Sequence, residues 1–140
     1  MNQRDILKIM NTKLFKVISS CSDQNNVKCY LIGGFVRDLI TGNKEPKDID
    51  ILIIGDGIYI AKKVCNILGL NDPTIYKRFG TAAFKFNEYD IEFVGSRKES
   101  YSKKSRNPVV EVGSFDDDLN RRDFTINTIC VCLNSSNWGK

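Results

Sequence analysis

The chain has 140 residues, a formal net charge of +4 and 41% hydrophobic content, which is enough apolar material for one core. It contains neither a run long enough to span a bilayer nor a secretory signal, so we expect a cytoplasmic protein. It has no histidine, and its five cysteines form no CxxC pair. This composition argues against disulfide frameworks, zinc ribbons and histidine-based catalysis, so the thiols are expected to be idle and any catalysis to use carboxylates.

Hydrophobic patterning in the first half alternates between helix and strand. Apolar residues at helical spacing predict one amphipathic helix over residues 5–21. The apolar run VKCYLI predicts a buried strand over 27–32 that stops at Gly33 and Gly34. The elements expected next are a helix over 35–40, a strand over 48–54 and a helix over 58–68 that closes at Gly69.

The second half is richer in strand patterns. β-branched and aromatic runs predict three strands, and a polar, basic stretch without periodicity predicts a long loop. A helical segment passing into a final strand follows. The strands are expected over 74–79, 81–86 and 90–95, the loop over 96–115, and the helical segment with its final strand over 116–133. Helices and strands therefore mix along one chain, which indicates a single α+β domain over residues 1–140.

Two aspartates, Asp48 and Asp50, begin the predicted strand DIDILII. Residues two apart in a strand share a face, with Cα atoms about 6.5 to 7 Å apart, so both carboxylates point one way while Ile49 and Ile51 face the core. Adjacent negative charges repel unless a cation lies between them, and such pairs hold Mg²⁺ for phosphoryl displacement. The alternative is that DID is the solvated start of an edge strand.

A glycine pair, Gly33 and Gly34, lies between a predicted strand and a predicted helix. Thirteen residues separate it from Asp48, enough for a short helix and a return to the next strand. Glycines let backbone N–H groups approach phosphates closely, and a helix N-terminus favours anions. The pair therefore indicates a triphosphate site, although glycines before a helix also occur for packing alone.

Glu92 is the candidate third carboxylate. It lies on a predicted strand among apolar neighbours, where a carboxylate is costly unless it is paired, metal-bound or open to a cleft. Asp90 is its competitor on the same face, although its place after NEY suggests a turn. The alternative for Glu92 is an exposed residue on an edge strand.

The segments GGFVRDLITGNKEPKDIDI and NRRDFTINTIC closely resemble the catalytic head of the tRNA nucleotidyltransferase (CCA-adding enzyme) and poly(A) polymerase family. These enzymes are class II polymerase-β-like nucleotidyltransferases. FGTAAFKF, IEFVGSRKESY and SRNPVVEVGSFDDDLNRRDFTIN follow in the family's order, so the resemblance covers nearly all of the chain after the first helix. It implies an α+β head with a mixed, mostly antiparallel sheet of about five strands flanked by helices.

The resemblance also implies residue roles. Asp48 and Asp50 match the metal-binding carboxylates, and Glu92 matches the third catalytic carboxylate. Asp38 either holds Arg37 toward phosphate or forms a surface ion pair with it. The residues implied to bind nucleotide are Gly33, Gly34, Arg37, Arg121, Arg122, Asp123 and Asn127; in the basic loop, Arg97 and Arg106 are candidates for RNA phosphate or else solvated surface.

The implied reaction is attack by an RNA 3′-hydroxyl on the α-phosphate of CTP or ATP, with release of pyrophosphate and two Mg²⁺ ions as cofactors. The expected partners are ATP, CTP and the 3′ end of tRNA or another RNA, without a membrane. In the family, neck, body and tail regions follow the head and select the base. We therefore expect the head to be incomplete as a stand-alone enzyme.

Three interpretations stay open. A CCA-adding or A-adding head is not separable here from a poly(A) polymerase head. A compact nucleotidyltransferase that modifies a protein or small molecule would explain the short chain but not RRDFTIN. A non-catalytic nucleotide-binding module would not need an intact acidic cluster, and a sugar-nucleotide DxD transferase would explain neither the glycine pair nor the final motif.

Overall fold

The computed structural model describes residues 3–42, 46–100, 109–113 and 129–140. Its helices are α1 (Gln3–Met10), α2 (Lys13–Gln24), α3 (Gly34–Thr41) and α4 (Gly57–Leu68). Its strands are β1 (Lys28–Ile32), β2 (Asp48–Ile54), β3 (Thr74–Tyr76), β4 (Thr81–Phe86), β5 (Tyr89–Gly95), β6 (Arg97–Ser100), β7 (Val109–Val112) and β8 (Cys130–Cys132). Two short 3₁₀ turns, η1 (Lys77–Phe79) and η3 (Ser135–Asn137), complete the described elements.

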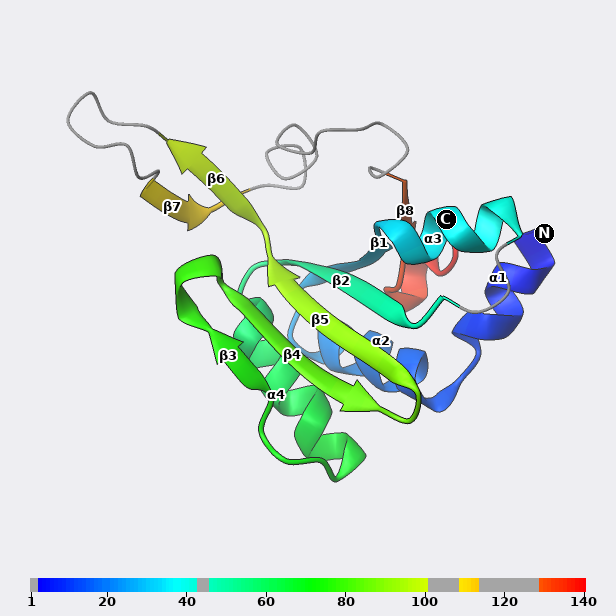
Figure 1. Cartoon of the computed structure of the whole chain (residues 1–140), viewed down its shortest axis with the longest axis horizontal. Coiled ribbons are helices and arrows are strands. Elements are labelled where there is room, and N and C mark those ends of the chain that lie inside the picture. Colours follow the sequence, from blue (N-terminus) through cyan, green and yellow to red (C-terminus); the bar gives the residue numbers. More distant parts are fainter. Residues whose placement is uncertain (1–2, 43–45, 101–108, 114–128) are drawn as a thin grey trace.

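A six-stranded sheet in the order β3-β4-β5-β2-β1-β8 organises the fold (Figure 1). β2 and β5 pair in parallel, whereas the other four pairs of this sheet are antiparallel. β6 and β7 form a separate antiparallel hairpin that extends beyond β5. The predicted α+β class and mostly antiparallel sheet are therefore confirmed.

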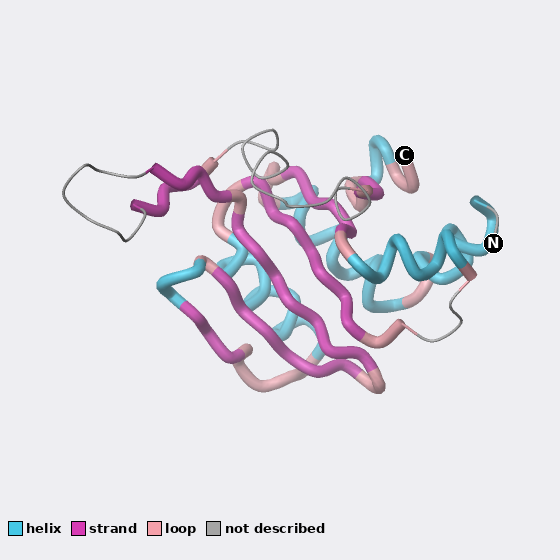
Figure 2. The backbone as a smooth tube through the Cα atoms, turned by 45° about the horizontal axis from the view of Figure 1, so that its top comes forward, coloured by secondary structure: helices cyan, strands magenta, loops and turns pink. Residues whose placement is uncertain are grey.

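Helices cover one face of the sheet. α4 packs against β2, β4 and β5, while α2 packs against β1 and α4, so both lie behind the sheet in Figure 1. The smooth trace in Figure 2 shows the same layering from another side. Ile49, Ile51 and Ile53 of β2 are at most 1% exposed in the core. Because side chains alternate along a strand, Asp48 and Asp50 lie on the opposite face, which no described helix of this layer covers.

Three expectations about elements were wrong. The first helix is two helices, because Asn11 and Thr12 interrupt it and Thr12 is extended as the N-terminal residue before α2; polar residues of this kind favour helix ends over helix interiors. The strand expected over 74–79 ends at Tyr76, and η1 replaces its second half. The expected loop over 96–115 contains β6 and β7. The helical segment expected near 116–128 lies outside the described residues, and β8 confirms the final strand.

All five cysteines are free thiols, and four of them are buried. Burial, the dominant influence, raises the pKa of Cys29 to about 12, so this thiol stays protonated at neutral pH. The free thiols agree with the expectation of cysteines outside a disulfide framework, and Cys130 is the half-buried one. None of the described helices has both the length and the apolar character required to cross a bilayer.

Asn134 anchors the segment after β8 to the start of the sheet. Its Oδ1 accepts a hydrogen bond from the Cys29 backbone N–H at 2.8 Å, and its Nδ2 donates to the Val27 carbonyl at 2.9 Å and to Asp23 Oδ1 at 2.8 Å. The Ser135 backbone N–H donates to the other Asp23 oxygen at 3.1 Å. One amide side chain thus satisfies backbone groups that would otherwise lack partners.

We expect Asn134→Ala to lower the free energy of unfolding by about 1 to 3 kcal/mol, because it leaves partly buried backbone groups without hydrogen-bond partners. Urea unfolding measured by circular dichroism gives this value. Asn137→Ala is the matched control, since the exposed Asn137 amide bonds only exposed partners, Ser136 and Lys140, among the side-chain hydrogen bonds described for it. Equal stability of the two variants would contradict the anchoring role.

Asp23 makes the same anchor sensitive to pH. Burial raises the pKa of its carboxyl, but the hydrogen bonds from Ser135 and Asn134 outweigh this effect and hold the pKa below the ordinary 3.8. A carboxyl group whose pKa is lower in the folded than in the unfolded state contributes its full stabilisation above about pH 4. This contribution is lost as the pH falls through the folded pKa. The stability gap between wild type and Asp23→Asn is expected to shrink between pH 7 and pH 3. A gap that stays constant across that range would refute this origin.

Candidate active site

The parallel pairing of β2 with β5 brings the acidic residues together. Asp50 lies opposite Glu92, and Asp48 lies opposite Asp90. Neighbouring strands are about 4.8 Å apart, and residues in register share a face of the sheet. Four carboxylates therefore lie on the face that the helix layer leaves uncovered. Three of them, Asp48, Asp90 and Glu92, are exposed, and Asp50 is half-buried.

Asp90 and Glu92 differ in their partners. Asp90 is a strand residue of β5, so the expectation of a turn at this position was wrong. On the other side of β5, Lys85 of β4 lies opposite Asp90, and its Nζ is 3.0 Å from Asp90 Oδ1. Within the described part of the chain, no lysine or arginine pairs with Glu92. β5 is an interior strand, so Glu92 is exposed without lying at a sheet edge, and it remains the stronger candidate for the third carboxylate.

Gly33 forms the turn between β1 and α3 directly beside Asp50. Its φ is 75° and its ψ is −151°, a region that is open almost only to glycine. A Cβ atom at this position would lie 2.8 Å from Asp50 Oδ2. Glycine is therefore required twice, once by the backbone conformation and once by the approach of the carboxylate. The predicted strand-to-helix turn is confirmed, and it touches the acidic cluster.

Arg37 lies over the second glycine of the turn. Its guanidinium Nη2 is 3.3 Å from where a Gly34 Cβ would be. The Nε and Nη2 atoms both lie 2.8 Å from Asp38 Oδ1, so the ion pair expected between these neighbours is present. The Arg37 side chain is 39% exposed, which leaves part of this cation accessible beside the turn.

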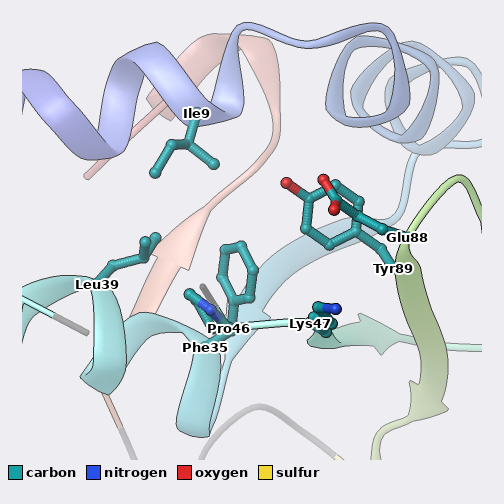
Figure 3. Close-up of a pocket in the computed structure, with 7 residues that line it drawn as sticks. All are labelled: Ile9, Phe35, Leu39, Pro46, Lys47, Glu88 and Tyr89. Carbon is teal, nitrogen blue, oxygen red and sulfur yellow. The ribbon is translucent and has the colours of Figure 1, made fainter. Parts of the chain in front are cut away.

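An aromatic contact links the glycine turn to β5. The Phe35 ring, one residue after Gly34, meets the Tyr89 ring edge-on, with centroids 6.4 Å apart and planes at 74°. Figure 3 shows both rings at a small cavity of about 200 Å³, which is also lined by Ile9, Leu39, Pro46, Lys47 and Glu88. Packing of α3 against the start of β5 thereby limits movement of the turn relative to Glu92.

A larger hollow of about 400 Å³ opens over the acidic cluster. Its lining includes Asp48, Asp50 and Glu92, and it continues onto β3 and β4. Sequence reasoning missed the residues that these two strands contribute, which are Thr74, Tyr76, Ala83, Phe84 and Lys85. The alternation in TAAFKF places Ala83 and Lys85 on one face, but only the pairing of β4 with β5 shows that this face carries Glu92.

The acidic cluster has the chemistry of a divalent-cation site. Carboxylate oxygens are the ligands of hard cations such as Mg²⁺, which commonly takes one or two protein carboxylates and completes its shell with water and substrate phosphate. Among the described residues, no group of three His, Cys, Asp or Glu side chains is arranged to hold a metal ion without such help. Asp48 and Asp50 on one face, next to the glycine turn at Gly33, fit a cation shared with a phosphate ligand.

Several expected site residues lie outside the described parts of the chain. They are Arg106, Arg121, Arg122, Asp123 and Asn127. Arg97 begins β6, which continues from the end of β5, but its side chain is not among those described. Their assignment to nucleotide or RNA stays a prediction. The structure brings together Gly33, Gly34, Arg37, Asp48, Asp50 and Glu92 on neighbouring elements.

Comparison with known proteins shows the family to which the chain is similar. Residues 29–138 match the poly A polymerase head domain. An A-adding tRNA nucleotidyltransferase of Geobacter sulfurreducens is 36% identical over 145 residues, which cover 98% of this chain and 16% of that protein. A solved CCA-adding enzyme in its apo form is 32% identical with a TM-score of 0.78, over 94% of this chain and 30% of that one.

A second solved structure carries substrates. It is a tRNA nucleotidyltransferase complexed with a primer tRNA and an incoming ATP analog, 31% identical with a TM-score of 0.74, over 88% of this chain and 33% of that one. The match to the head domain covers most of this sequence, and the chain belongs to the tRNA nucleotidyltransferase and poly(A) polymerase head-domain family. It spans about a third or less of the length of these relatives.

We expect Gly33→Ala to displace Asp50 and to weaken magnesium-dependent nucleotide binding about ten-fold, equivalent to about 1.4 kcal/mol. The added methyl would meet Asp50 Oδ2. Calorimetric titration measures the affinity. Gly69→Ala is the control, because Gly69 also has a positive φ (+72°) but no atom within 4 Å of the added Cβ. Loss of binding in both variants would point to general destabilisation instead of the contact with Asp50.

Proposed function

We propose that this chain is the catalytic head of an RNA nucleotidyltransferase that adds CMP or AMP, taken from CTP or ATP, to the 3′ end of tRNA. The observation that carries the proposal is the pairing of Asp50 with Glu92 beside the Gly33 turn, with Asp48 on the same face. Such a cluster needs a cation, and a glycine turn at a helix start suits the phosphates that would share it.

The similar proteins support the choice of substrates. The Geobacter relative bears the name of an A-adding tRNA nucleotidyltransferase, and two solved neighbours contain CTP or a primer tRNA with an ATP analog. Poly(A) polymerases of Salmonella also match, at 30% identity over 73% of this chain. The shared reaction is attack of an RNA 3′-hydroxyl on a nucleoside triphosphate. Most of the matches named here have tRNA in their names, which supports tRNA as the acceptor.

In the proposed mechanism the chain positions and neutralises its substrates. The backbone N–H groups at Gly33 and Gly34 face the triphosphate, and Arg37, steadied by Asp38, adds a positive charge beside them. Asp48 and Asp50 would hold the cation, and Glu92 would complete the acidic cluster and orient the attacking hydroxyl. Two Mg²⁺ ions, when bound, would lower the pKa of the attacking hydroxyl and neutralise the leaving pyrophosphate. A cytoplasmic location remains a prediction.

The test is calorimetric titration of ATP, CTP, GTP and UTP into the chain with and without Mg²⁺. We expect magnesium-dependent binding with little preference among the bases, and a loss of at least about ten-fold in Asp48→Asn/Asp50→Asn, because the cation loses its protein ligands. The control is Asp72→Asn, which removes an exposed carboxylate between α4 and β3 that does not line the hollow.

Two outcomes would contradict the proposal. One is binding that survives the loss of Asp48 and Asp50, which would separate the nucleotide site from the acidic cluster. The other is a wild-type chain that is folded by circular dichroism but binds no nucleotide in the presence of Mg²⁺. A loss of binding in Asp48→Asn/Asp50→Asn supports the proposal only if the control variant binds nucleotide as wild type does.

A further inference from the structure

The hollow over the acidic cluster extends from β2 and β5 across β4 to β3. A row of residues in register crosses four strands, from Thr74 of β3 through Ala83 of β4 and Glu92 of β5 to Asp50 of β2. Ala83 is the smallest side chain of this row and leaves a shallow floor beside Glu92. Tyr76, two residues after Thr74 and therefore on the same face of β3, also lines the hollow.

The segment from Tyr76 to Phe79 combines aromatic and basic side chains on the surface. Tyr76 is 49% exposed and Phe79 is 51% exposed, and Lys77 and Arg78 between them are exposed as well. The Arg78 guanidinium lies 5.9 Å from the centroid of the Phe79 ring. Exposed aromatic rings next to basic residues are the features with which proteins hold single-stranded nucleic acid, by stacking on bases and by pairing with phosphates.

The order of the strands indicates which substrate the segment from Tyr76 to Phe79 faces. The Gly33 turn follows β1, the carboxylates lie on β2 and β5, and Tyr76 lies on β3, so the carboxylates separate the turn from Tyr76. In an in-line displacement the attacking oxygen and the leaving pyrophosphate lie on opposite sides of the α-phosphate. If the triphosphate extends toward the Gly33 turn, the acceptor must arrive from the side of β3.

We propose that Tyr76, Lys77 and Arg78 form the acceptor subsite, with the Tyr76 ring stacked on the 3′-terminal base of the RNA and the two cations facing its last phosphates. This inference rests on the proposed function, because it uses the direction of the triphosphate. Tyr76 is a positioning residue here: it holds the terminal nucleotide so that the 3′-hydroxyl reaches the acidic cluster.

The experiment is a fluorescence anisotropy titration of the whole chain with a 5′-fluorescein single-stranded RNA. Two RNAs are compared, one intact and one with an abasic 3′-terminal nucleotide. Stacking on one base changes affinity about five-fold or more, so wild type is expected to bind the abasic RNA at least about five-fold more weakly. Tyr76→Ala is expected to bind the intact RNA at least about five-fold more weakly and to lose the distinction between the two RNAs, while Tyr76→Phe keeps both properties.

Matched surface variants serve as controls. Tyr59→Ala removes a tyrosine of similar exposure, 48%, from α4 on the helix-covered side of the sheet, and is expected to behave as wild type. Lys77→Ala/Arg78→Ala is expected to weaken binding of both RNAs equally and to reduce the salt dependence by about 0.7 in logarithmic slope for each phosphate that the variant no longer neutralises. Lys62→Ala/Lys63→Ala on α4 is the charge-matched comparison.

Three outcomes would overturn the acceptor subsite. They are a wild-type chain that does not bind the intact RNA, a wild-type chain that does not distinguish the two RNAs, and a Tyr76→Ala variant that still distinguishes them. Magnesium-dependent nucleotide binding is measured on the same samples. If it persists while the acceptor experiment fails, only the role of Tyr76 is wrong; if it is absent in wild type, the proposed function fails as well.

Discussion

The register between β2 and β5 is the constraint on which the site depends. It places Asp50 beside Glu92 although their charges repel. The side chains on the other face of the same strands are buried isoleucines and Phe93. A shift of one residue would expose these apolar side chains and bury the carboxylates, so hydrophobic burial fixes where the acidic groups lie. The stability of the core is thus the source of the free energy that holds like charges together.

Close packing also fixes the position of the turn between β1 and α3 relative to β2 and β5. Asp50 lies against Gly33 with no room for a methyl group, and Phe35 packs edge-on against Tyr89 at the start of β5. The turn, the helix after it, Asp50 and the start of β5 are therefore packed together, although about forty residues of chain separate Asp50 from Tyr89. A site built on strands and a packed helix is more rigid than one built on loops.

Sequence patterns predicted the parts of this site that depend on local chemistry. The β-branched run DIDILII predicted β2 with its observed bounds, and the glycine pair predicted the turn, because both signals come from neighbouring residues. Pairing between distant strands leaves no such signal, so the alignment of Lys85 with Asp90 and the place of Tyr76 at the hollow were not predictable. The break at Thr12 was missed because helical spacing continues across it.

The two edges of the six-stranded sheet share one property. β3 and β8 are three residues long each, whereas β2 between them is seven. A short edge offers few unpaired backbone groups to a strand of another molecule, and β3 is followed at once by η1, which turns the chain out of the sheet. The strongly apolar interior strands are thereby shielded at both sides from pairing between copies, a protection against aggregation that leaves the acidic face open.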